Sequence, residues 1–212
     1  DFDGSGNGSY PCGSLISDGL SLFGMTQAGG TYNAGTIFKI NSDGTNYTKL
    51  MEFDGAGNGG QPLSSLLSVG TALYGMTVSA GLNGVGTIFK INPDGTGYSK
   101  LLDFDYPITG GGANGNFISD GNSLYGMLTN GGANNLGTMF KINLNGTGFT
   151  KLMDFDGNGN GSNPYGSLIF NGNYLYGMTQ GGGSANLGTV FKYQYCFPPT
   201  ADDPGNVVAC NT

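Results

Sequence analysis

Carboxylates are the side chains of this sequence with the clearest potential for chemistry, and they come in pairs around a phenylalanine. Four such triplets occur, at Asp1-Phe2-Asp3, Glu52-Phe53-Asp54, Asp103-Phe104-Asp105 and Asp154-Phe155-Asp156. Paired carboxylates can hydrolyse a glycosidic bond as acid and base. A catalytic pair should occur once, whereas these pairs recur, and the chain has no histidine to act as a base. We therefore predict a protein that is not an enzyme, with a glycoside-acting enzyme as the least favoured alternative.

Calcium binding is a second chemistry that these carboxylates could perform. In the fourth copy, oxygen-bearing side chains alternate along the chain at Asp154, Asp156, Asn158 and Asn160. This spacing resembles the first half of an EF-hand loop, although Tyr165 stands where the closing acidic ligand belongs. The first copy offers a similar set at Asp1, Asp3 and Asn7. Two interpretations remain open, a calcium site and a solvated loop whose carboxylates have no ligand.

Amide and tyrosine side chains populate the long glycine-rich segments between the apolar runs. The candidate ligand-binding residues are Tyr10, Gln27, Tyr32, Asn33, Asn83, Asn134, Tyr165, Gln180 and Asn186. Amides donate and accept hydrogen bonds and aromatic rings pack on sugar faces, so an uncharged surface of this kind suits a glycan. The alternative is that asparagine and glycine merely supply the turns.

Charge excludes two classes of partner. The net charge is −7 with a pI near 4.1, and all seven basic residues are lysines at two repeated positions. Nucleic acids and anionic membrane surfaces require basic patches, so neither is an expected partner. No apolar run reaches the length of about 18 residues that a membrane span needs, so no membrane insertion is expected.

A 51-residue period organises the chain. Phe2, Phe53, Phe104 and Phe155 mark it, and a Gly-Thr-x-Phe-Lys motif begins at Gly35, Gly86, Gly137 and Gly188 in the same register. Such periods are typical of solenoids and propellers. We predict four repeat units over residues 1–51, 52–102, 103–153 and 154–196, followed by a proline-containing tail over residues 197–212.

Each unit has the pattern of four short strands. In the first copy, apolar alternation predicts strands at Ser14–Ser17, Ser21–Thr26, Thr36–Asn41 and Tyr47–Phe53. Asp18-Gly19 and Asp43-Gly44 supply the chemistry of tight hairpin turns. Four antiparallel strands in about 50 residues describe a propeller blade, so the predicted fold is an all-β propeller of four four-stranded blades. The long connections should then emerge together on one face.

Closure of the ring is left open by the irregular fourth copy. The segment Tyr195-Cys196-Phe197-Pro198-Pro199 replaces its last hairpin. Either Asp1-Phe2-Asp3 or the tail Asn206–Ala209 completes the last blade, or the chain belongs to a larger ring in a longer protein or a dimer. The three cysteines give no zinc spacing. Cys196 and Cys210 are a candidate disulfide, which leaves Cys12 as a buried free thiol or an intermolecular partner.

The repeat resembles a known family. Leu73-Tyr74-Gly75-Met76-Thr77, followed by Gly86-Thr87-Ile88-Phe89-Lys90-Ile91 and Asp94-Gly95-Thr96, is similar to the GloVer tandem repeat of bacterial choice-of-anchor proteins. The resemblance implies a propeller-like fold, export and a place at the cell surface, but no catalytic residues. We expect a secreted or surface protein that binds an extracellular glycan or surface polymer in adhesion. The alternative is a self-associating structural protomer of an extracellular assembly or filament.

Overall fold

Fifteen β-strands and no helix make up residues 1–195, the part of the chain that the computed structural model describes. The first half contains β1 (Ser9–Ser17), β2 (Ser21–Ala28), β3 (Thr36–Asn41), β4 (Thr48–Glu52), β5 (Leu67–Val69), β6 (Ala72–Met76), β7 (Thr87–Ile91) and β8 (Ser99–Asp103). The second half contains β9 (Ile118–Ser119), β10 (Ser123–Leu128), β11 (Thr138–Asn143), β12 (Thr150–Asp154), β13 (Ile169–Asn171), β14 (Tyr174–Met178) and β15 (Val190–Gln194). Within these residues no helix is long and apolar enough to cross a membrane.

The strands form four consecutive antiparallel sheets, which we call blades 1 to 4. Blades 1, 2 and 3 have four strands each, in the orders β1-β2-β3-β4, β5-β6-β7-β8 and β9-β10-β11-β12. Blade 4 consists of β13, β14 and β15 within the described residues. The predicted all-β blade architecture is confirmed. In blade 1 the second, third and fourth strands begin and end within about two residues of their predicted bounds.

The first strand of blade 1 differs from its prediction. It runs from Ser9 to Ser17 instead of from Ser14, and its pairing with β2 shifts register between Cys12 and Ile16. The shift is a bulge, in which one strand gains residues without a partner. Because a bulge interrupts the alternation of apolar and polar residues, the pattern of side chains concealed the first half of this strand.

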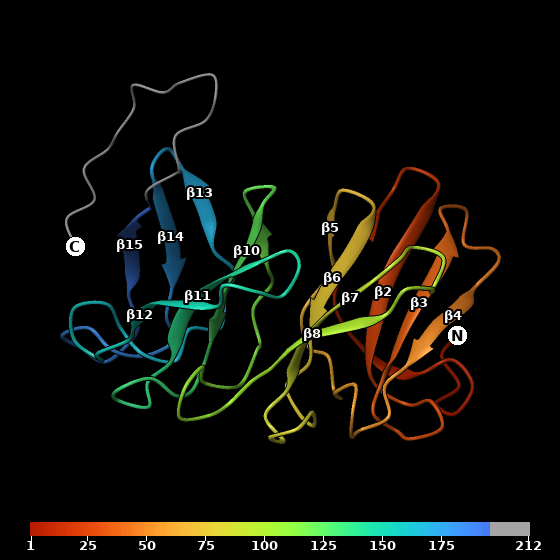
Figure 1. Ribbon diagram of the computed structural model, residues 1–212, viewed down its shortest axis with the longest axis horizontal. Helices are drawn as coiled ribbons and strands as arrows, with labels where there is room; N and C mark the ends of the chain where they lie inside the picture. The colour runs from red at the N-terminus through yellow and green to blue at the C-terminus, as the bar shows by residue number, and fades with distance from the viewer. Residues whose placement is uncertain (196–212) are drawn as a thin grey trace.

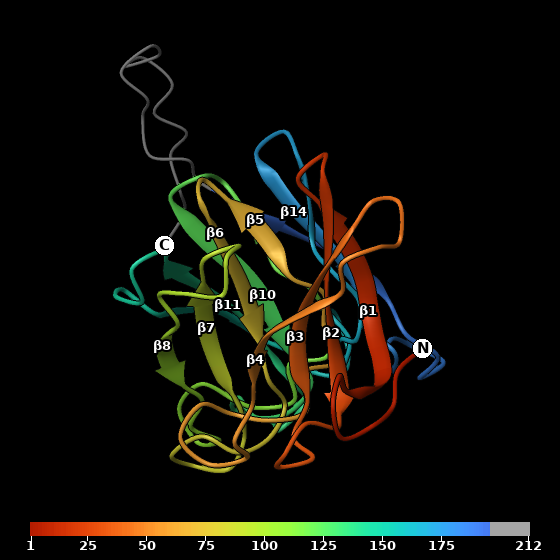
Figure 2. The same cartoon turned by 90° about the vertical axis from the view of Figure 1, so that its right-hand side faces the viewer.

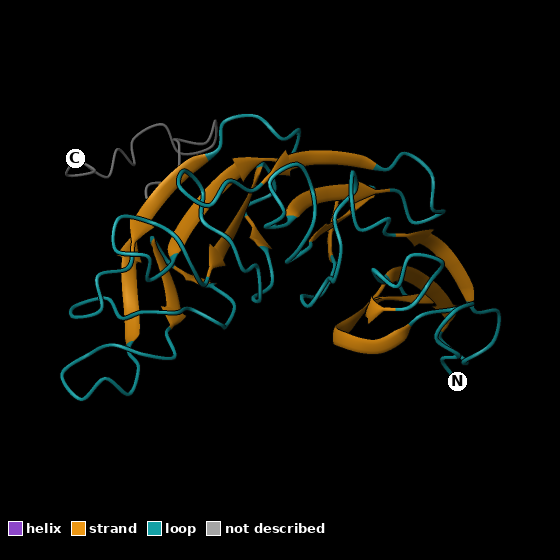
Figure 3. Cartoon of the chain, turned by 90° about the horizontal axis from the view of Figure 1, so that it is seen from below, coloured by secondary structure: helices purple, strands orange, loops and turns teal. Residues whose placement is uncertain are grey.

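Neighbouring blades are linked near the start of their first strands. Ser14 N of β1 donates to Ser65 Oγ at 2.6 Å, and Ser65 N donates to Asn116 Oδ1 at 2.6 Å; Ser65 and Asn116 lie two residues before β5 and β9. Figure 3 shows the four sheets following one another along an open arc. Blade 1 and blade 4 stand at its two ends, as Figure 1 shows, and Figure 2 looks onto the blade 1 end.

Apolar residues fill each junction between consecutive blades. At the first junction, Phe23 and Ile37 of blade 1 pack with Phe89 of blade 2, all buried. The phenylalanine of each acidic triplet crosses into the next blade: the ring centroids of Phe53 and Phe89 lie 5.3 Å apart in an edge-on arrangement. The repeat therefore builds its core between blades, because a single sheet has no second layer to cover it.

The N-terminal triplet and the C-terminal tail are the two segments of this chain that were predicted to complete blade 4. Phe2 packs on Phe38 of blade 1 with ring centroids 5.4 Å apart. Among the described residues, the N-terminal triplet packs on blade 1 and forms no strand of blade 4, which has three strands, so closure through this triplet stays a prediction. The tail Asn206–Ala209 and the candidate disulfide between Cys196 and Cys210 lie outside the described residues.

Candidate functional site

The long connections of every blade come together on one face, the lower one in Figure 1, which Figure 3 views from below. Bridges tie the connection that enters each blade to the connection between its second and third strands: Gly60 pairs with Ser79, Gly111 with Asn130 and Ser162 with Gly181. In blade 1, Gly30 N donates to Gly4 O at 3.0 Å. This loop face, which we define as residues 3–10, 27–35, 54–63, 78–86, 105–115, 129–137, 156–166 and 180–188, carries the candidate binding residues.

The second carboxylate of the triplets closes the loop that follows it. Asp3 Oδ1 accepts hydrogen bonds from Gly6 N at 2.8 Å and Asn7 N at 2.9 Å, while Asn7 Oδ1 accepts from Asp3 N at 2.6 Å. The backbone amides of Asn7 and Gly6 hold the pKa of Asp3 below its ordinary value of 3.8. Asp54 and Asp156 make the same kind of network. The loop therefore keeps its shape through its own side chains.

The calcium hypothesis rests on the same loop in blade 4. There Asp156 Oδ1 accepts from Asn158 N at 2.9 Å and Asn160 N at 3.2 Å, and Asn160 Oδ1 accepts from Asp156 N at 2.7 Å. These backbone amides also lower the pKa of Asp156, and the Asn160 amide has the largest effect. Asp156 Oδ1 and Asn160 Oδ1 thus already have hydrogen-bond partners within the loop, whereas ligand oxygens of an EF-hand loop converge on the ion.

Two further observations bear on a metal. Lys151 Nζ lies 2.9 Å from Asp154 Oδ1, so Asp154 forms an ion pair instead of standing free. Asp1 contributes its carbonyl oxygen, which accepts from Asn7 Nδ2 at 2.9 Å. Among residues 1–195 no group of three or more acidic, cysteine or histidine side chains could hold a metal ion. Calcium remains a prediction of the sequence that these contacts do not favour.

The first carboxylates of the second and third triplets, Glu52 and Asp103, have another structural task. Glu52 forms an ion pair with Lys49 and accepts from Thr31 N at 3.0 Å, and both contacts lower its pKa, that of Lys49 most. Asp103 pairs with Lys100 at 2.8 Å and accepts from Leu82 N at 2.8 Å. The outer strand thus holds the tip of its own blade's long loop. In the second triplet the two carboxylates serve two separate loops: Glu52 holds the long loop of blade 1, and Asp54 closes the loop that follows it.

Four of the predicted binding residues are used to build turns. Asn33 and Asn186 have positive φ angles of 51° and 56°, and their side-chain oxygens accept from Gly29 N and Gly182 N at 2.9 Å each. Asparagine tolerates this left-handed backbone conformation better than other non-glycine residues. Asn83 and Asn134 donate to the carbonyl oxygens of Phe104 and Phe155. The turn interpretation accounts for these side chains, while a binding role for them stays a prediction.

The remaining candidates are more available. Tyr10, Tyr32 and Tyr165 are 72%, 63% and 55% exposed. Gln180 is exposed, and Gln27 is half-buried with its Oε1 3.9 Å from Cys12 Sγ. Cys12 itself is a free, half-buried thiol. These exposed rings and the Gln180 amide thus belong to blades 1 and 4, and the structure does not bring them into one cluster.

Sequence reasoning missed two exposed apolar side chains of the loop face. Leu82 is 81% exposed and Ile108 is 66% exposed. Leu82 stands where the other copies have Thr31, Ala133 and Ser184, and Ile108 lies in the one loop of this type that lacks the Asp-to-Asn network. The signal that could have found them is therefore departure from the repeat.

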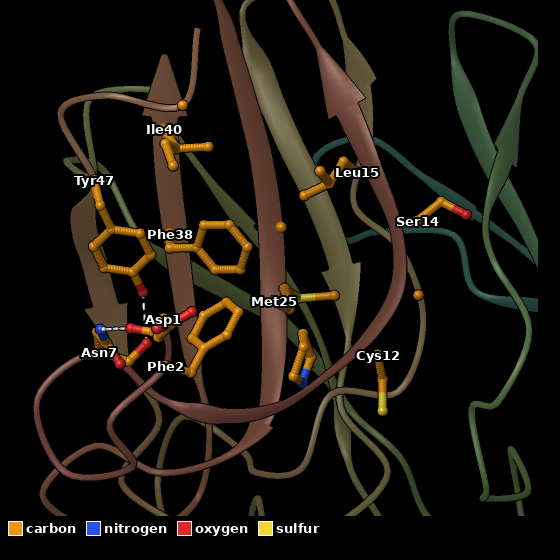
Figure 4. Close-up of a pocket in the computed structure, with 14 residues that line it drawn as sticks. Asp1, Phe2, Asn7, Cys12, Ser14, Leu15, Met25, Phe38, Ile40 and Tyr47 are labelled. Carbon is orange, nitrogen blue, oxygen red and sulfur yellow. Dashed lines mark hydrogen bonds between the residues drawn. The ribbon is translucent and has the colours of Figure 1, made fainter. Parts of the chain in front are cut away.

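A hollow of about 660 Å³ opens at the blade 1 end of the arc, shown in Figure 4. Leu15, Phe38 and Ile40 line it together with Phe2, whose ring lies beside that of Phe38. Tyr47 stacks on Phe38 at 5.3 Å between ring centroids and donates to Asn7 O at 2.5 Å. Burial raises the pKa of Tyr47. The hollow is apolar and displays no charged side chain that could act as acid or base apart from Asp1.

Solved structures similar to this chain are β-propellers of low sequence identity. A chain of a nidogen/laminin complex has a TM-score of 0.55 and 17% identity, over 79% of this chain and 56% of that one. An enzyme of Niastella koreensis called GH74 has a TM-score of 0.53 and 18% identity, over 88% of this chain and 27% of that one. TolB of Acinetobacter baumannii has a TM-score of 0.50 and 13% identity, over 85% and 41%.

These matches extend over little more than half of the solved chains at most, and at such identities they show the fold alone. No curated protein matches this chain in sequence. The sequence profile of the Gloeobacter/Verrucomicrobia repeat matches residues 1–191, from the N-terminus into the last strand of blade 4. The chain belongs to the Gloeobacter/Verrucomicrobia repeat family, as the resemblance of its motifs predicted.

Proposed function

We propose that this protein is a secreted or cell-surface binding propeller without catalytic activity, and that its loop face recognises an extracellular glycan or surface polymer in adhesion. The observation that carries the proposal is the exposure of Tyr10, Tyr32 and Tyr165 on a face where most carboxylates and asparagines are committed to turns. Exposed tyrosines can pack on sugar rings while their hydroxyl groups bond to sugar hydroxyls.

The distribution of carboxylates supports the absence of catalysis. Acid and base catalysis of glycoside hydrolysis needs two carboxyl groups facing one bond. Here Glu52 and Asp103 are paired with lysines of the same strand, and Asp3 and Asp156 accept from loop amides. Some propellers of similar fold do act on saccharides, among them an oligogalacturonate lyase in complex with manganese, with 12% identity. For this chain, that similarity supports only the choice of saccharides as ligands to test.

The test is a binding screen against a panel of extracellular polysaccharides. Tyr10→Ala, Tyr32→Ala and Tyr165→Ala remove the exposed rings one at a time, and Leu20→Ala is the matched control because Leu20 is 80% exposed in a turn outside the loop face. At least one tyrosine variant should weaken binding about tenfold, whereas the control should bind like the wild type. Absence of binding to the whole panel, or binding that survives removal of all three rings, would overturn the proposal.

Repeating the screen with chelator separates two versions of the proposal. Binding that is unchanged by removal of divalent ions fits the loop geometry, in which Asp156 and Asn160 already accept backbone hydrogen bonds. Binding that disappears with chelator and returns with calcium would restore the calcium hypothesis for Asp154, Asp156, Asn158 and Asn160.

A structural role in an extracellular assembly is the second candidate function. The observation that favours it is a pair of apolar faces, at the two ends of the arc, that are exposed among residues 1–195. Leu15 at one end is 53% exposed and Val190 at the other is 76% exposed.

A further inference from the structure

The first end face of the arc belongs to blade 1 and consists of Phe2, Leu15, Phe38 and Ile40. Its counterparts in blade 2 are buried in the first junction. Leu15 is 53% exposed whereas Leu66 is 3% exposed, and Phe2 is 38% exposed whereas Phe53 is fully buried. The residue types match, but Leu66 and Phe53 lie in a core cluster shared by blades 1 and 2. The hollow in Figure 4 lies on the first end face.

The last end face belongs to blade 4 and consists of Ile169, Met178, Leu187 and Val190. Met178, Leu187 and Val190 are 60%, 85% and 76% exposed. Their counterparts in blade 1 are Met25, Ala34 and Ile37, which are 2%, 6% and 0% exposed against blade 2. Exposed apolar surface of this kind, four residues on one face, is typical of an interaction site.

Polar contacts fix how unlike faces meet at the internal junctions. Gln61 N donates to Ala34 O at 2.7 Å, and Asn163 N donates to Leu136 O at 2.8 Å, each from one blade to the preceding one. Tyr10 and Leu187 hold the corresponding positions at the two ends, and Tyr10 has the same positive φ as Gln61, 54°. The backbone at Tyr10 is therefore already in the conformation that Gln61 has at the first internal junction.

The glycines of the outer hairpins also distinguish an internal junction from the first end face. A Cβ at Gly95 would lie 3.1 Å from Leu50 O of the preceding blade, and one at Gly146 would lie 2.9 Å from Leu101 O. The corresponding Gly44 of blade 1 has nothing within 4 Å of such a Cβ. The first end face is thus open from its inner strand to its outer hairpin, over the width that a blade covers elsewhere.

We propose that the first end face of one copy binds the last end face of a second copy, which repeats the internal blade junction between chains. Leu15, Phe38 and Ile40 of one copy then contact Met178 and Val190 of the other, and Tyr10 N donates to Leu187 O across the interface. The occupant is a second copy because the last end face carries the apolar pattern that covers the corresponding surface at each internal junction. Since the two faces are different, the contact is heterologous, and it closes a ring or extends a filament.

The test uses two variants that each destroy one face. Leu15→Asp places a charge on the first end face, and Val190→Asp places one on the last. Both side chains are exposed in the single chain, so each variant should fold as the wild type does. Leu20→Asp, outside both faces, is the control for an added charge. Native mass spectrometry and light scattering measure the assembly over a range of concentrations.

The proposal predicts that wild type and Leu20→Asp associate, and that each interface variant alone remains monomeric. An equimolar mixture of Leu15→Asp and Val190→Asp should form a dimer of one copy of each, because it retains one intact pair of faces. A wild type that stays monomeric at the highest attainable concentration would overturn the proposal. Self-association of either variant alone would also overturn it, since that would show contact between like faces.

Discussion

The junction between blades 1 and 2 and the two ends of the arc are made of nearly the same residues, yet one is buried and the others are not. Phe53 is fully buried while Phe2 is 38% exposed. Both rings pack edge-on against a phenylalanine of the following blade, Phe53 against Phe89 and Phe2 against Phe38. The comparison teaches that burial in this fold is a property of the neighbour and not of the blade. Stability of such repeats is then the sum of blades and their junctions.

The largest expected effect compares one phenylalanine in both settings. Phe104→Ala should lower the free energy of unfolding by about 3–5 kcal/mol, because the fully buried ring leaves a cavity between blades 2 and 3. Phe2→Ala should lower it by less than about 2 kcal/mol in dilute protein, since that ring is already partly in water. Chemical denaturation of both variants gives the two values. Equal losses would show that Phe2 is as well covered as Phe104.

Adding a methyl group should also destabilise an internal junction more than the first end face, with smaller losses than the phenylalanine variants. A methyl group at Gly75 would lie 2.4 Å from the ring of Phe89, which is held between blades, and Gly75→Ala should cost about 1–3 kcal/mol. A methyl group at Gly24 would lie 2.6 Å from the ring of Phe38. The cost of Gly24→Ala should be smaller, because Phe38 borders the open hollow and has room to move. Thermal unfolding of the two variants measures the difference, and a larger loss for Gly24→Ala would contradict it.

Acid should weaken the contact by which Glu52 holds the long loop of blade 1. Lys49 and the Thr31 amide lower the pKa of Glu52 below its ordinary value of 4.5. A lowered pKa means that the carboxylate stabilises the fold above pH 4.5 and loses this contribution as the pH falls below that value. The melting temperature of Glu52→Gln should therefore be lower than that of wild type at pH 7, and the gap should narrow at acidic pH. A gap that is independent of pH would exclude an electrostatic role for Glu52.

Added calcium should have the smallest effect on the melting temperature. The relevant comparison is between the loops that begin at Asp156 and at Asp105. Asp156 in blade 4 closes its loop with Asn160, whereas the loop of blade 3 uses Asp105 and Thr109, with Asp105 N donating to Thr109 Oγ1 at 2.8 Å. Because both loops are closed without a metal, calcium added to chelated protein should leave the melting temperature unchanged. A clear rise that Asp156→Asn abolishes would support the calcium hypothesis instead.

The strands of the blades could be predicted from the sequence, whereas the bulge in β1 and the exposure at the two ends of the arc could not, for physical reasons. Strands such as Thr36–Asn41 are bounded by turn residues and alternate regularly, so local pattern determines them. The bulge between Cys12 and Ile16 breaks that alternation and concealed part of β1. The pattern also cannot separate an asparagine that binds from one such as Asn33 that closes a turn, because both occur in glycine-rich loops. Exposure at the ends depends on a neighbour, and the repeat gives the same residues with or without it.

Hydrogen exchange measured blade by blade tests the central claim, that a neighbouring blade supplies the protection. In dilute protein, the amides of β6, β7, β10 and β11, which lie in the middle of the arc, should exchange about tenfold or more slowly than those of β14 and β15 at its end. Raising the protein concentration should slow exchange in blades 1 and 4 and leave the middle unchanged. Uniform protection of all four blades that does not respond to concentration would contradict the account.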